Sequence, residues 1–352
     1  MIQQLLDQTV LRNASISVIV VNINRRAMLT ECFQSLADQT QQPLEVILVD
    51  NGSTDGSLDV PFLFPGLNIR VIQNATNLGF CAANNQGFAI ASGQLFALLN
   101  NDAVAEPEWL ANLATAFELG PRVGMAASKI LVYSQRDKID KVGHLIYWDG
   151  QNRGRGAGQR DTGQFDRIEE ILWPDGCAAM YSREMIDEIG GFDEEFFAYA
   201  DDAELGLRGR LAGWQSYYMP KARVYHHRGS TLGVFSPVRI ELIERNRILL
   251  VFKHFPWSLV WLNGWFYLLR VTAGVAAAIR GKGEAGKIPG FLPKLRGGLA
   301  LIWGAMRALP LIPSMVRKRR RFQPLRRLSN RELWKLLRKY SISLKELSEQ
   351  ST

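Results

Sequence analysis

Short apolar runs that end abruptly in clusters of Asn and Asp constrain the fold of this chain more than any other feature. Three such runs, each with the polar cluster that follows it, occupy residues 16–21 and 22–24, 45–49 and 50–55, and 95–99 and 100–102. Their length and apolar content are typical of buried strands, and the run at 16–21 is also rich in β-branched residues. Because Asn, Asp, Gly and Ser are turn formers, each strand is predicted to end in a loop that carries polar side chains.

Helical patterns separate these strands. Met28, Cys32 and Leu36 fall on one face of a predicted helix. A further strand and two more helices are predicted at residues 69–72, 82–91 and 107–119. The alternation indicates an α/β fold in which a mostly parallel central sheet is covered by helices on both faces. In such sheets ligands bind beyond the carboxyl ends of the strands, where the three polar clusters lie.

The regular pattern breaks over residues 134–170, which are rich in Gly and charge and are expected to form a long, mobile loop region. The Gly-Arg-Gly-Ala-Gly run at 154–158 resembles a dinucleotide-binding loop, but it follows no predicted strand and opens no predicted helix. Regular structure is expected again over 171–228. Its predicted helices and strands are 183–189, 201–212, 215–219 and 222–226.

Charge is divided unevenly along the chain. The formal net charge is +8, but residues 1–235 hold 19 Lys+Arg and 28 Asp+Glu, a net of −9, whereas residues 236–352 hold 23 and 6, a net of +17. A hydrophobic content of 47% with only three cysteines excludes a collagen, a disulfide scaffold and a wholly disordered chain. A strongly basic segment favours phosphate-rich partners, either nucleic acid or an anionic membrane.

The cysteines and the first residues indicate the cellular compartment in which the protein is expected. Cys32, Cys81 and Cys177 are far apart and form no CxxC pair, so neither a disulfide framework nor a zinc finger is predicted, and a reducing compartment is expected. The first fifteen residues have no basic start and no long apolar core, unlike a signal peptide. We therefore expect the catalytic part to stay in the cytoplasm.

The basic segment begins with apolar stretches. Residues 257–279 hold one charge, Arg270, in 23 positions. They are long enough to span a bilayer, but a central Arg costs about 2.5–3.5 kcal/mol on insertion. We therefore favour an interfacial helix or re-entrant hairpin over a span, and a buried helix is the third alternative. A second apolar stretch at 299–316 contains two prolines, and Arg and Lys clusters follow it.

These shifts in composition divide the chain. An N-terminal extension is predicted over 1–14 and a catalytic α/β domain over 15–235. A helical, apolar, membrane-associating region is predicted over 236–316 and a basic C-terminal tail over 317–352. Since no aromatic platform or helix-turn-helix accompanies the tail, we expect no nucleic-acid partner and favour an anionic membrane surface.

Two of the polar clusters offer carboxylates with alternative roles. Asp50, at a strand end, suits the recognition of a nucleobase N–H or a ribose hydroxyl, but an Asp in this place also caps the following turn. The run Asn100-Asn101-Asp102 offers hard oxygen ligands for Mg²⁺ or Mn²⁺, and an ordinary Asn/Asp turn is the alternative.

Two later clusters carry a possible base and a possible metal ligand. Asp201 and Asp202 are adjacent at the predicted start of a helix, where carboxylates favour the helix dipole. Adjacent residues point in different directions, so one of the two can face a cleft and act as a general base. His226 follows a predicted strand and is suited to complete a metal site, although a lone histidine is more often structural.

The sequence resembles glycosyltransferase family 2, and most closely its rhamnosyltransferase-like, O-antigen and cell-wall branch. The resemblance spans about residues 15–255. It rests on Val-Ile-Val-Val-Asn-Ile-Asn-Arg, Leu-Val-Asp-Asn-Gly-Ser-Thr-Asp-Gly, Asn-Leu-Gly-Phe-Cys-Ala-Ala-Asn-Asn-Gln-Gly, Leu-Leu-Asn-Asn-Asp-Ala, Gly-Gly-Phe-Asp-Glu-Glu-Phe-Phe-Ala-Tyr-Ala-Asp-Asp-Ala-Glu-Leu, Val-Tyr-His-His and the Arg-Asn-Arg at 245–247.

The resemblance implies a GT-A fold and an inverting, metal-dependent transfer from a nucleotide sugar. It implies Asp202 as the general base, with Asp201 the second choice, and Asp102 and His226 as ligands of Mg²⁺ or Mn²⁺. The residues it assigns to the nucleotide sugar are Asn22, Asn24, Asp50, Asn77, Asn84, Asn85, Asn100, Asn101 and Gly176. Ile23 stands where the family usually has Tyr, and Asn100 stands where it usually has Asp.

The expected reaction moves a sugar, with rhamnose from dTDP-rhamnose the first choice, to a hydroxyl of a lipid-linked or cell-surface glycan. The expected location is the cytoplasmic face of the cell membrane. Another donor, such as a UDP-hexose, UDP-galactofuranose or a UDP-N-acetylhexosamine, is the main alternative. A non-catalytic nucleotide-sugar-binding membrane protein is less favoured because the acidic pair is intact.

Overall fold

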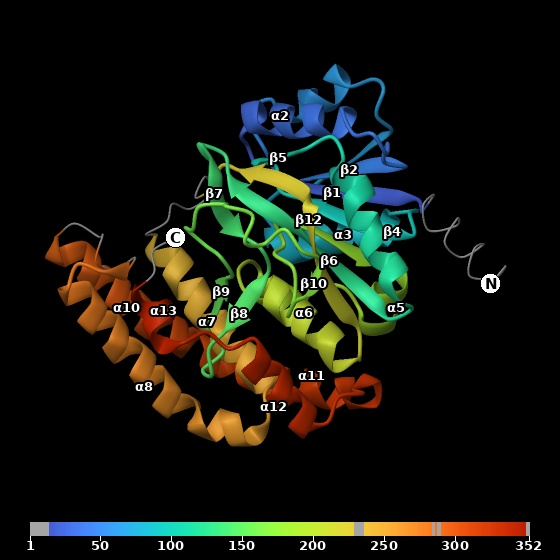
Figure 1. Ribbon diagram of the computed structural model, residues 1–352. Coiled ribbons are helices and arrows are strands. Elements are labelled where there is room, and N and C mark those ends of the chain that lie inside the picture. Colours follow the sequence, from blue (N-terminus) through green and yellow to red (C-terminus); the bar gives the residue numbers. More distant parts are fainter. Residues whose placement is uncertain (1–13, 229–235, 284–285, 287–289, 350–352) are drawn as a thin grey trace.

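A computed structural model describes residues 14–228, 236–283, 286 and 290–349 (Figure 1). The predicted N-terminal extension, apart from Ala14, lies outside the described residues. The predicted boundary at 235 also lies outside them.

One half of the central sheet is parallel. Its strands, in spatial order, are β3 (Ile69–Gln73), β2 (Glu45–Asp50), β1 (Ile16–Asn22) and β4 (Leu95–Leu99). The chain adds β2 and β3 on one side of β1 and then crosses back to place β4 on the other side. The switch point between β1 and β4 is where a sheet of this kind binds its ligand.

The other half of the sheet is mixed. The strand β11 (Ala178–Ser182) runs antiparallel between β4 and β6 (Val123–Val132), and β12 (Gln215–His226) runs parallel to β6. The short β5 (Ala103–Ala105) pairs with β12, so that Ala103 is opposite His226. A single long strand with an irregularity after Met219 replaces the two strands predicted at 215–226.

Helices cover both faces of the sheet, as predicted. The helix α2 (Arg26–Ala37) and α4 (Trp109–Ala114), which continues as the 3-10 helix η2 (Thr115–Leu119), pack on one face. The helices α3 (Gly79–Ile90), α5 (Arg183–Ile189) and α6 (Asp201–Leu211) pack on the other. Two apolar cores therefore sandwich the sheet, and the α/β fold class is confirmed.

The prediction of a long loop over 134–170 is partly wrong. The segment contains β7 (Gln135–Lys141), β8 (His144–Ile146), β9 (Asn152–Gly154) and β10 (Glu169–Glu170). β7 pairs with β6, β10 pairs with β12, and β8 and β9 form a separate hairpin. These strands carry many charges and little apolar alternation, so sequence periodicity gives no sign of them. Of the four, β7 and β10 find their hydrogen-bonding partners outside the segment.

Helices follow the sheet along the chain. They are α7 (Pro237–His254), α8 (Trp257–Ile279), α10 (Phe291–Ala308), α11 (Ile312–Phe322), α12 (Asn330–Lys339) and α13 (Leu344–Glu349). In Figure 1 this orange and red layer wraps the α6 side of the domain. The helices α10 and α11 pack along α7, while α13 packs on α8.

The segment predicted as a basic tail is folded onto the domain. The side chain of Ser329 and that of Glu332 form a capping box at the start of α12. Leu333 and Leu337 of this helix are buried in the core that lies under α6. Beyond α12, the Ile342 N–H donates to the carbonyl oxygen of Ile146 in β8 at 3.1 Å.

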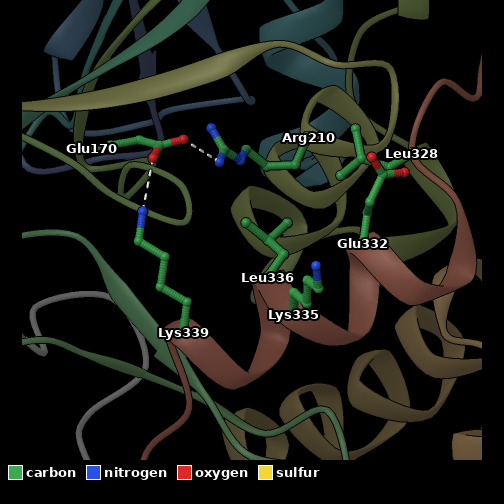
Figure 2. A pocket seen from close by; sticks show the side chains of 7 residues that line it. All are labelled: Glu170, Arg210, Leu328, Glu332, Lys335, Leu336 and Lys339. Carbon is green, nitrogen blue, oxygen red and sulfur yellow. Dashed lines mark hydrogen bonds and ion pairs between the residues drawn. The ribbon is translucent and has the colours of Figure 1, made fainter.

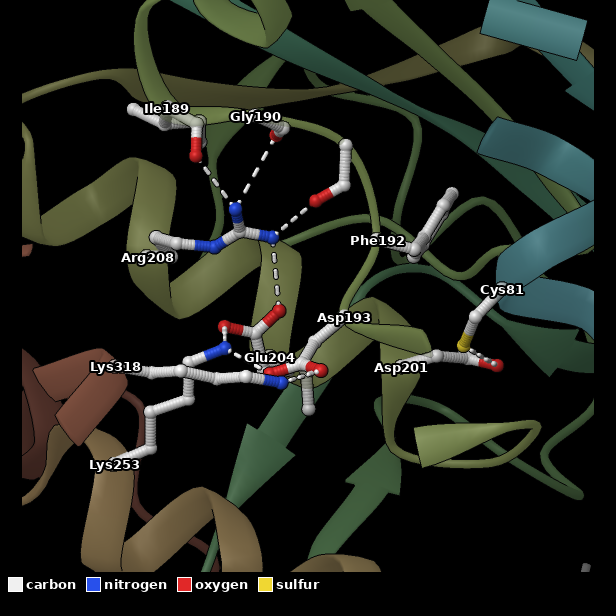
Figure 3. Close-up of polar contacts among 12 residues, drawn as sticks. Cys81, Ile189, Gly190, Phe192, Asp193, Asp201, Glu204, Arg208, Lys253 and Lys318 are labelled. Atoms are coloured by element: carbon white, nitrogen blue, oxygen red, sulfur yellow. Dashed lines mark hydrogen bonds and ion pairs between the residues drawn. The ribbon is translucent and has the colours of Figure 1, made fainter. Parts of the chain in front are cut away.

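Acidic groups of the domain pair with the basic segment. Glu170 bridges Arg210 of α6 and Lys339 of α12, at 2.5 and 2.8 Å, beside a surface hollow that Figure 2 shows. Asp193 pairs with Lys318 of α11 (Figure 3). The negative and positive halves of the chain therefore partly neutralise each other within one structure.

The apolar stretch at 257–279 forms one continuous helix, α8. By length and composition alone, α8 and the segment Leu292–Leu325 could each cross a membrane. Arg270, the single charge of α8, pairs with Asp149 and Glu244, which are both buried. The opposite surface of α8 is strongly apolar, and Trp261 is 85% exposed.

Candidate active site

Polar side chains from three neighbouring strands meet at the carboxyl edge of the sheet. Asn22 ends β1, Asp50 ends β2, and Asn101 follows β4. The Asn101 amide donates to Oδ1 of Asn22 at 2.6 Å, and the Asn22 amide donates to Oδ2 of Asp50 at 3.0 Å. All three residues are buried. The fold therefore joins the predicted polar clusters into one hydrogen-bonded chain at the switch point.

Asp50 caps the turn that follows β2. Its Oδ1 accepts from the N–H groups of Gly52 and Ser53, and its Oδ2 accepts from the Ser53 hydroxyl as well as from Asn22. Asp50 therefore has the turn-capping role that the sequence offered as the alternative to base recognition. A role in recognising the base stays a prediction, and it requires a ligand to displace one of these donors. Asn24 is exposed, and its Oδ1 accepts from the Thr54 N–H.

The asparagines before and within α3 also have partners within the protein. Oδ1 of Asn77 accepts from the Gly79 N–H at 2.9 Å, and the Asn84 amide donates to the Phe80 carbonyl. Asn85 exchanges two hydrogen bonds with the backbone of Phe192, one through each end of its amide. The predicted contact of these residues with the nucleotide sugar is untested.

Asp102 and His226 come together, as the paired strands β5 and β12 require. Nε2 of His226 lies 3.4 Å from Oδ1 of Asp102, and Nδ1 of the same ring lies 2.8 Å from Oδ2 of Asp140. Asn100 precedes this pair, and its backbone N–H donates to the Cys177 carbonyl.

The residues of this pair fit a divalent cation. A carboxylate and an imidazole nitrogen face each other, and a second carboxylate, that of Asp140, binds the far nitrogen of the ring. This is the arrangement by which proteins orient a metal-binding histidine. Burial opposes a charge on His226, yet Cys177, Asp102 and Asp140 outweigh it and raise the pKa of the ring well above its usual value. The site therefore favours positive charge.

A second group lies at the start of α6. Oδ2 of Asp202 lies 3.2 Å from Nε2 of His144, and the Gly176 N–H points to the same oxygen at 3.4 Å. Nε2 of His144 also lies 2.9 Å from Oδ2 of Asp175. Gly176 thus borders the candidate base. Asp175, His144 and Asp202 together are a cluster that by distance could hold a cation.

The two adjacent aspartates differ in their surroundings. Asp201 points to the buried Cys81 thiol, with Sγ 4.0 Å from its Oδ2 (Figure 3). Burial, and then the nearby Asp202 carboxylate, raise the pKa of Asp201 to about 8. Asp201 is therefore largely protonated at neutral pH, whereas Asp202 faces a histidine and a backbone N–H. The choice of Asp202 as the proton acceptor stays a prediction.

A strained segment sets the position of α6. Phe197, Tyr199 and Ala200 have φ values of 63°, 69° and 54°, in the left-handed region that such side chains rarely adopt. The amide nitrogen of Asn246 lies 2.7–2.8 Å from the carbonyl oxygens of Phe196, Ala198 and Tyr199. The Arg-Asn-Arg motif in α7 thus holds the backbone that leads into Asp201 and Asp202.

Buried ion pairs hold the body of α6. Glu204 pairs with Arg208 one turn later at 2.9 Å and with Lys253 of α7 at 2.7 Å (Figure 3). Burial opposes the charge on Glu204, but Arg208 and Lys253 outweigh it and lower its pKa well below the usual value. Nε2 of His254 lies 2.9 Å from the same carboxylate.

Sequence reasoning missed three residues of the site. His144 and Asp140 fall in the segment that was predicted to be a loop, and Asp175 lies in the Trp-Pro-Asp-Gly run that carries Gly176. The scarcity of histidine was the available signal, because His144 is one of only four in the chain.

The architecture matches solved glycosyltransferases. GalNAc-T7 with UDP, GalNAc and Mn2+ has a TM-score of 0.56 and 15% identity, covering 86% of this chain and 57% of that chain. The mannosyltransferase PcManGT from Pyrobaculum calidifontis, in complex with GDP-Man and Mn2+, has a TM-score of 0.51 and 18% identity, covering 92% and 88%. This likeness establishes the fold, which is of the GT-A type.

The family follows from the sequence comparison. Residues 17–190 match the model for glycosyl transferase family 2, and the chain carries a domain of that family. It is 28% identical over 240 residues to the N-acetylglucosaminyl-diphospho-decaprenol L-rhamnosyltransferase of Mycobacterium tuberculosis, covering 61% of this chain and 77% of that protein. It is 38% identical over 190 residues to a PGL/p-HBAD biosynthesis glycosyltransferase of Mycobacterium bovis, covering 53% and 66%.

Proposed function

We propose that this protein is an inverting glycosyltransferase that moves a sugar from a nucleotide sugar to a hydroxyl of a lipid-linked or cell-surface glycan. The observation that carries the proposal is the position of Asp202, a buried carboxylate at the start of α6 that faces His144 and the Gly176 N–H. The name of the Mycobacterium tuberculosis relative supports rhamnose as the sugar and a lipid-linked acceptor.

Asp202 acts as the general base. A sugar hydroxyl is a weak nucleophile near neutral pH, so its proton must be removed as it attacks the anomeric carbon. The Asp202 carboxylate takes this proton through Oδ2, while its Oδ1 stays bound to the Ala203 N–H at 2.7 Å. The new glycosidic bond forms as the bond to the diphosphate breaks. Attack from the opposite face inverts the anomeric carbon, and no covalent enzyme intermediate is needed.

Asp102 and His226 would hold Mg²⁺ or Mn²⁺, and Asp140 orients His226. The cation, when bound, offsets the negative charge that develops on the departing nucleoside diphosphate. The donor set of one carboxylate and one imidazole agrees with this role. The acidic charge around the site explains why a diphosphate would need a cation in order to bind there.

The nucleotide-sugar pocket is proposed at the carboxyl edge of β1, β2 and β4. It comprises the residues singled out from the sequence, which are Asn22, Asn24, Asp50, Asn77, Asn84, Asn85, Asn100, Asn101 and Gly176. The hydrogen-bonded chain from Asn101 through Asn22 to Asp50 supports this location, because it holds the polar side chains at the switch point in fixed positions. Rigid side chains of this kind position a ligand at little entropic cost.

The exposed apolar helices support a membrane partner. Large side chains on α8 and α10 stand in solvent, among them Trp261, Trp265 and Trp303. Trp is favoured at the membrane interface, and nearby Lys and Arg favour anionic lipids. We propose residues 15–235 as the catalytic domain and residues 236–316 as a surface-bound helical region on the cytoplasmic face of the membrane. Residues 317–352 form a basic region that supports both.

Substitution of the base tests the mechanism. Asp202→Asn keeps the shape of the side chain but removes its ability to accept the proton, so transfer should fall by about 10²–10⁴-fold. Binding of the nucleotide sugar, measured by calorimetry, should change little. Asp187→Asn, at an exposed position of α5, is the matched control and should turn over normally. Wild-type turnover by the Asp202 variant would overturn the assignment.

A donor screen separates rhamnose from the alternative sugars. Transfer and hydrolysis are measured with dTDP-rhamnose and with UDP- and GDP-sugars, each with Mn²⁺ and with EDTA. We expect dTDP-rhamnose to give the highest kcat/KM and EDTA to abolish transfer. A higher value with a UDP-hexose, UDP-galactofuranose or UDP-N-acetylhexosamine would replace rhamnose as the sugar and leave the reaction class intact.

A further inference from the structure

We propose that His144 is a positioning residue that holds the Asp202 carboxylate ionised and aimed at the acceptor hydroxyl. This inference rests on the proposed role of Asp202 as the base. It assigns a function to a residue of the β8–β9 hairpin that no sequence motif indicated.

The contacts of His144 are specific and buried. Nε2 lies 2.9 Å from Oδ2 of Asp175 and 3.2 Å from Oδ2 of Asp202, so one N–H is shared between two carboxylates. The ring is 6% exposed and lies against the indole of Trp173, with the ring centroids 6.1 Å apart. The imidazole therefore has little freedom to turn away from Asp202.

Asp175 holds the histidine in place. Its Oδ1 accepts from the Cys177 N–H at 3.0 Å, and its Oδ2 lies 2.6 Å from Nζ of Lys141. A carboxylate fixed in this way by a backbone group and an ammonium orients the imidazole that it contacts. Asp175 thus orients the His144 ring, and His144 in turn orients the Asp202 carboxylate.

The charged and titratable groups around this pair come from four elements. They are Lys141 of β7, Asp175 and Cys177 before β11, Tyr181 of β11, and Asp201 of α6. Burial disfavours the charged imidazole, but Asp202 and Asp175 outweigh it and raise the pKa of His144 to about 9. At neutral pH the ring is therefore a cation that stabilises the ionised form of Asp202.

A metal ion in this cluster is the main alternative. His144, Asp175 and Asp202 lie close enough to ligate one cation. However, the Asp175 oxygen that faces His144 is already bound by the Lys141 ammonium. A divalent ion placed there would lie against that positive charge, so the hydrogen-bonded arrangement is favoured. The number of bound Mn²⁺ ions distinguishes the two arrangements.

The pH dependence of kcat/KM tests the proposal in the full-length protein with Mn²⁺. His144→Gln keeps a hydrogen-bond donor but removes the charge. The ionised Asp202 carboxylate then loses the stabilisation of the neighbouring cation, so the acid limb of the profile should move up by about one to three pH units. Activity lost at pH 6 should return at high pH, and the KM of the donor should stay the same.

A second buried histidine supplies the control. His254 contacts Glu204, on the same helix as Asp202, at 2.9 Å, and burial lowers its pKa to about 4, so it is neutral at the pH of the assay. His254→Gln should leave the acid limb where it is. An unmoved acid limb in His144→Gln, or an equal shift in both variants, would overturn the proposal.

Two further measurements keep the outcomes distinct. Mn²⁺ titration should give the same stoichiometry for the wild type and His144→Gln, and loss of one bound ion in the variant would favour the metal alternative and overturn the proposal. If His144→Gln does not fold, NMR titration of the wild-type ring decides, and a His144 pKa at or below 6.5 would overturn it. Normal turnover by Asp202→Asn would instead contradict the proposed function, so the two failures can be told apart.

Discussion

Nε of Arg270 lies 2.5 Å from Oδ2 of Asp149, which joins the apolar helix α8 to the turn of the β8–β9 hairpin. The first strand of that hairpin carries His144. The same guanidinium contacts Glu244 of α7 at 2.8 Å. The one charge in α8 is thus neutralised by the protein, and the helix proposed to face the membrane is tied to the hairpin that contacts the candidate base.

Loss of this arginine should destabilise the fold. Arg270→Met removes one of two cationic partners from the buried Asp149 and Glu244 carboxylates, and Arg247 stays within 2.6 Å of Glu244. Breaking a buried pair costs about 3–5 kcal/mol, and the remaining Arg247 should hold the loss to the lower part of that range. Urea denaturation of the detergent-solubilised protein measures the change. Arg280→Met is the control, because Arg280 is 55% exposed and pairs with Glu349 at the surface, so its loss should cost about 1 kcal/mol or less. Equal losses in the two variants would contradict the prediction.

Asp201→Asn should stabilise the protein increasingly as the pH rises. The folded state holds the Asp201 proton up to a pKa of about 8, whereas the unfolded chain releases it near the ordinary value of 3.8. The wild type therefore loses stability between about pH 4 and pH 8, and the variant has no such proton to lose. Free energies of unfolding at pH 5, 6.5 and 8 check this. A difference between the two proteins that stays constant with pH would rule it out.

Asp140→Asn should weaken the binding of Mn²⁺ without removing a ligand. The Asp140 carboxylate accepts from Nδ1 of His226 at 2.8 Å, and loss of such an orienting group typically lowers metal affinity by about 10–100-fold. Titration followed by electron paramagnetic resonance measures the affinity. Asp137→Asn, on the same strand but exposed and paired with Arg160, should bind Mn²⁺ normally. Normal affinity in Asp140→Asn would argue against His226 as a ligand.

Leu333→Ala should reveal that the basic C-terminal segment is part of the fold. Leu333 is fully buried in the core beneath α6, and truncation of a buried leucine costs about 2–5 kcal/mol. Leu309→Ala is the control, since Leu309 is 62% exposed and its truncation should cost about 0.5 kcal/mol or less. Thermal unfolding in the absence of lipid measures both. If the C-terminal segment did not pack on the domain, the two variants would lose the same small amount of stability.

Trp261→Glu should weaken binding to anionic vesicles. Trp261 is 85% exposed on α8, the helix proposed to lie on the membrane, so a charge at this position should oppose binding. Flotation with phosphatidylglycerol vesicles measures the bound fraction, which should fall in the variant and also fall for the wild type as salt rises. Phe62→Glu is the control, because Phe62 is 84% exposed on η1 (Ser57–Leu63), on a different part of the surface. An equal effect of the two substitutions would exclude α8 as the contact.

Sequence reasoning predicted the α/β sheet and the location of its polar edge because both depend on local signals. Asn22, Asp50 and Asn101 each follow an apolar strand, and parallel strands bring their carboxyl ends to one side. The choice of Asp202 rather than Asp201 as the base came only from the family resemblance, because two adjacent aspartates cannot be told apart in the sequence. Their different surroundings are Cys81 beside Asp201 and His144 beside Asp202, which come from distant parts of the chain.

The sequence by itself determined the fold class, the family motifs and the division of charge, because periodicity and turn chemistry act between near neighbours. Only the tertiary structure decided which groups face Asp202 and what the basic segment does. His144 reaches Asp202 through a short hairpin whose strands are stabilised by pairing rather than by propensity. Lys318 and Lys339 belong to the basic segment predicted to favour an anionic membrane, and the fold pairs them with Asp193 and Glu170. Electrostatic pairing depends on distance in space, and that distance exists only after the chain has folded.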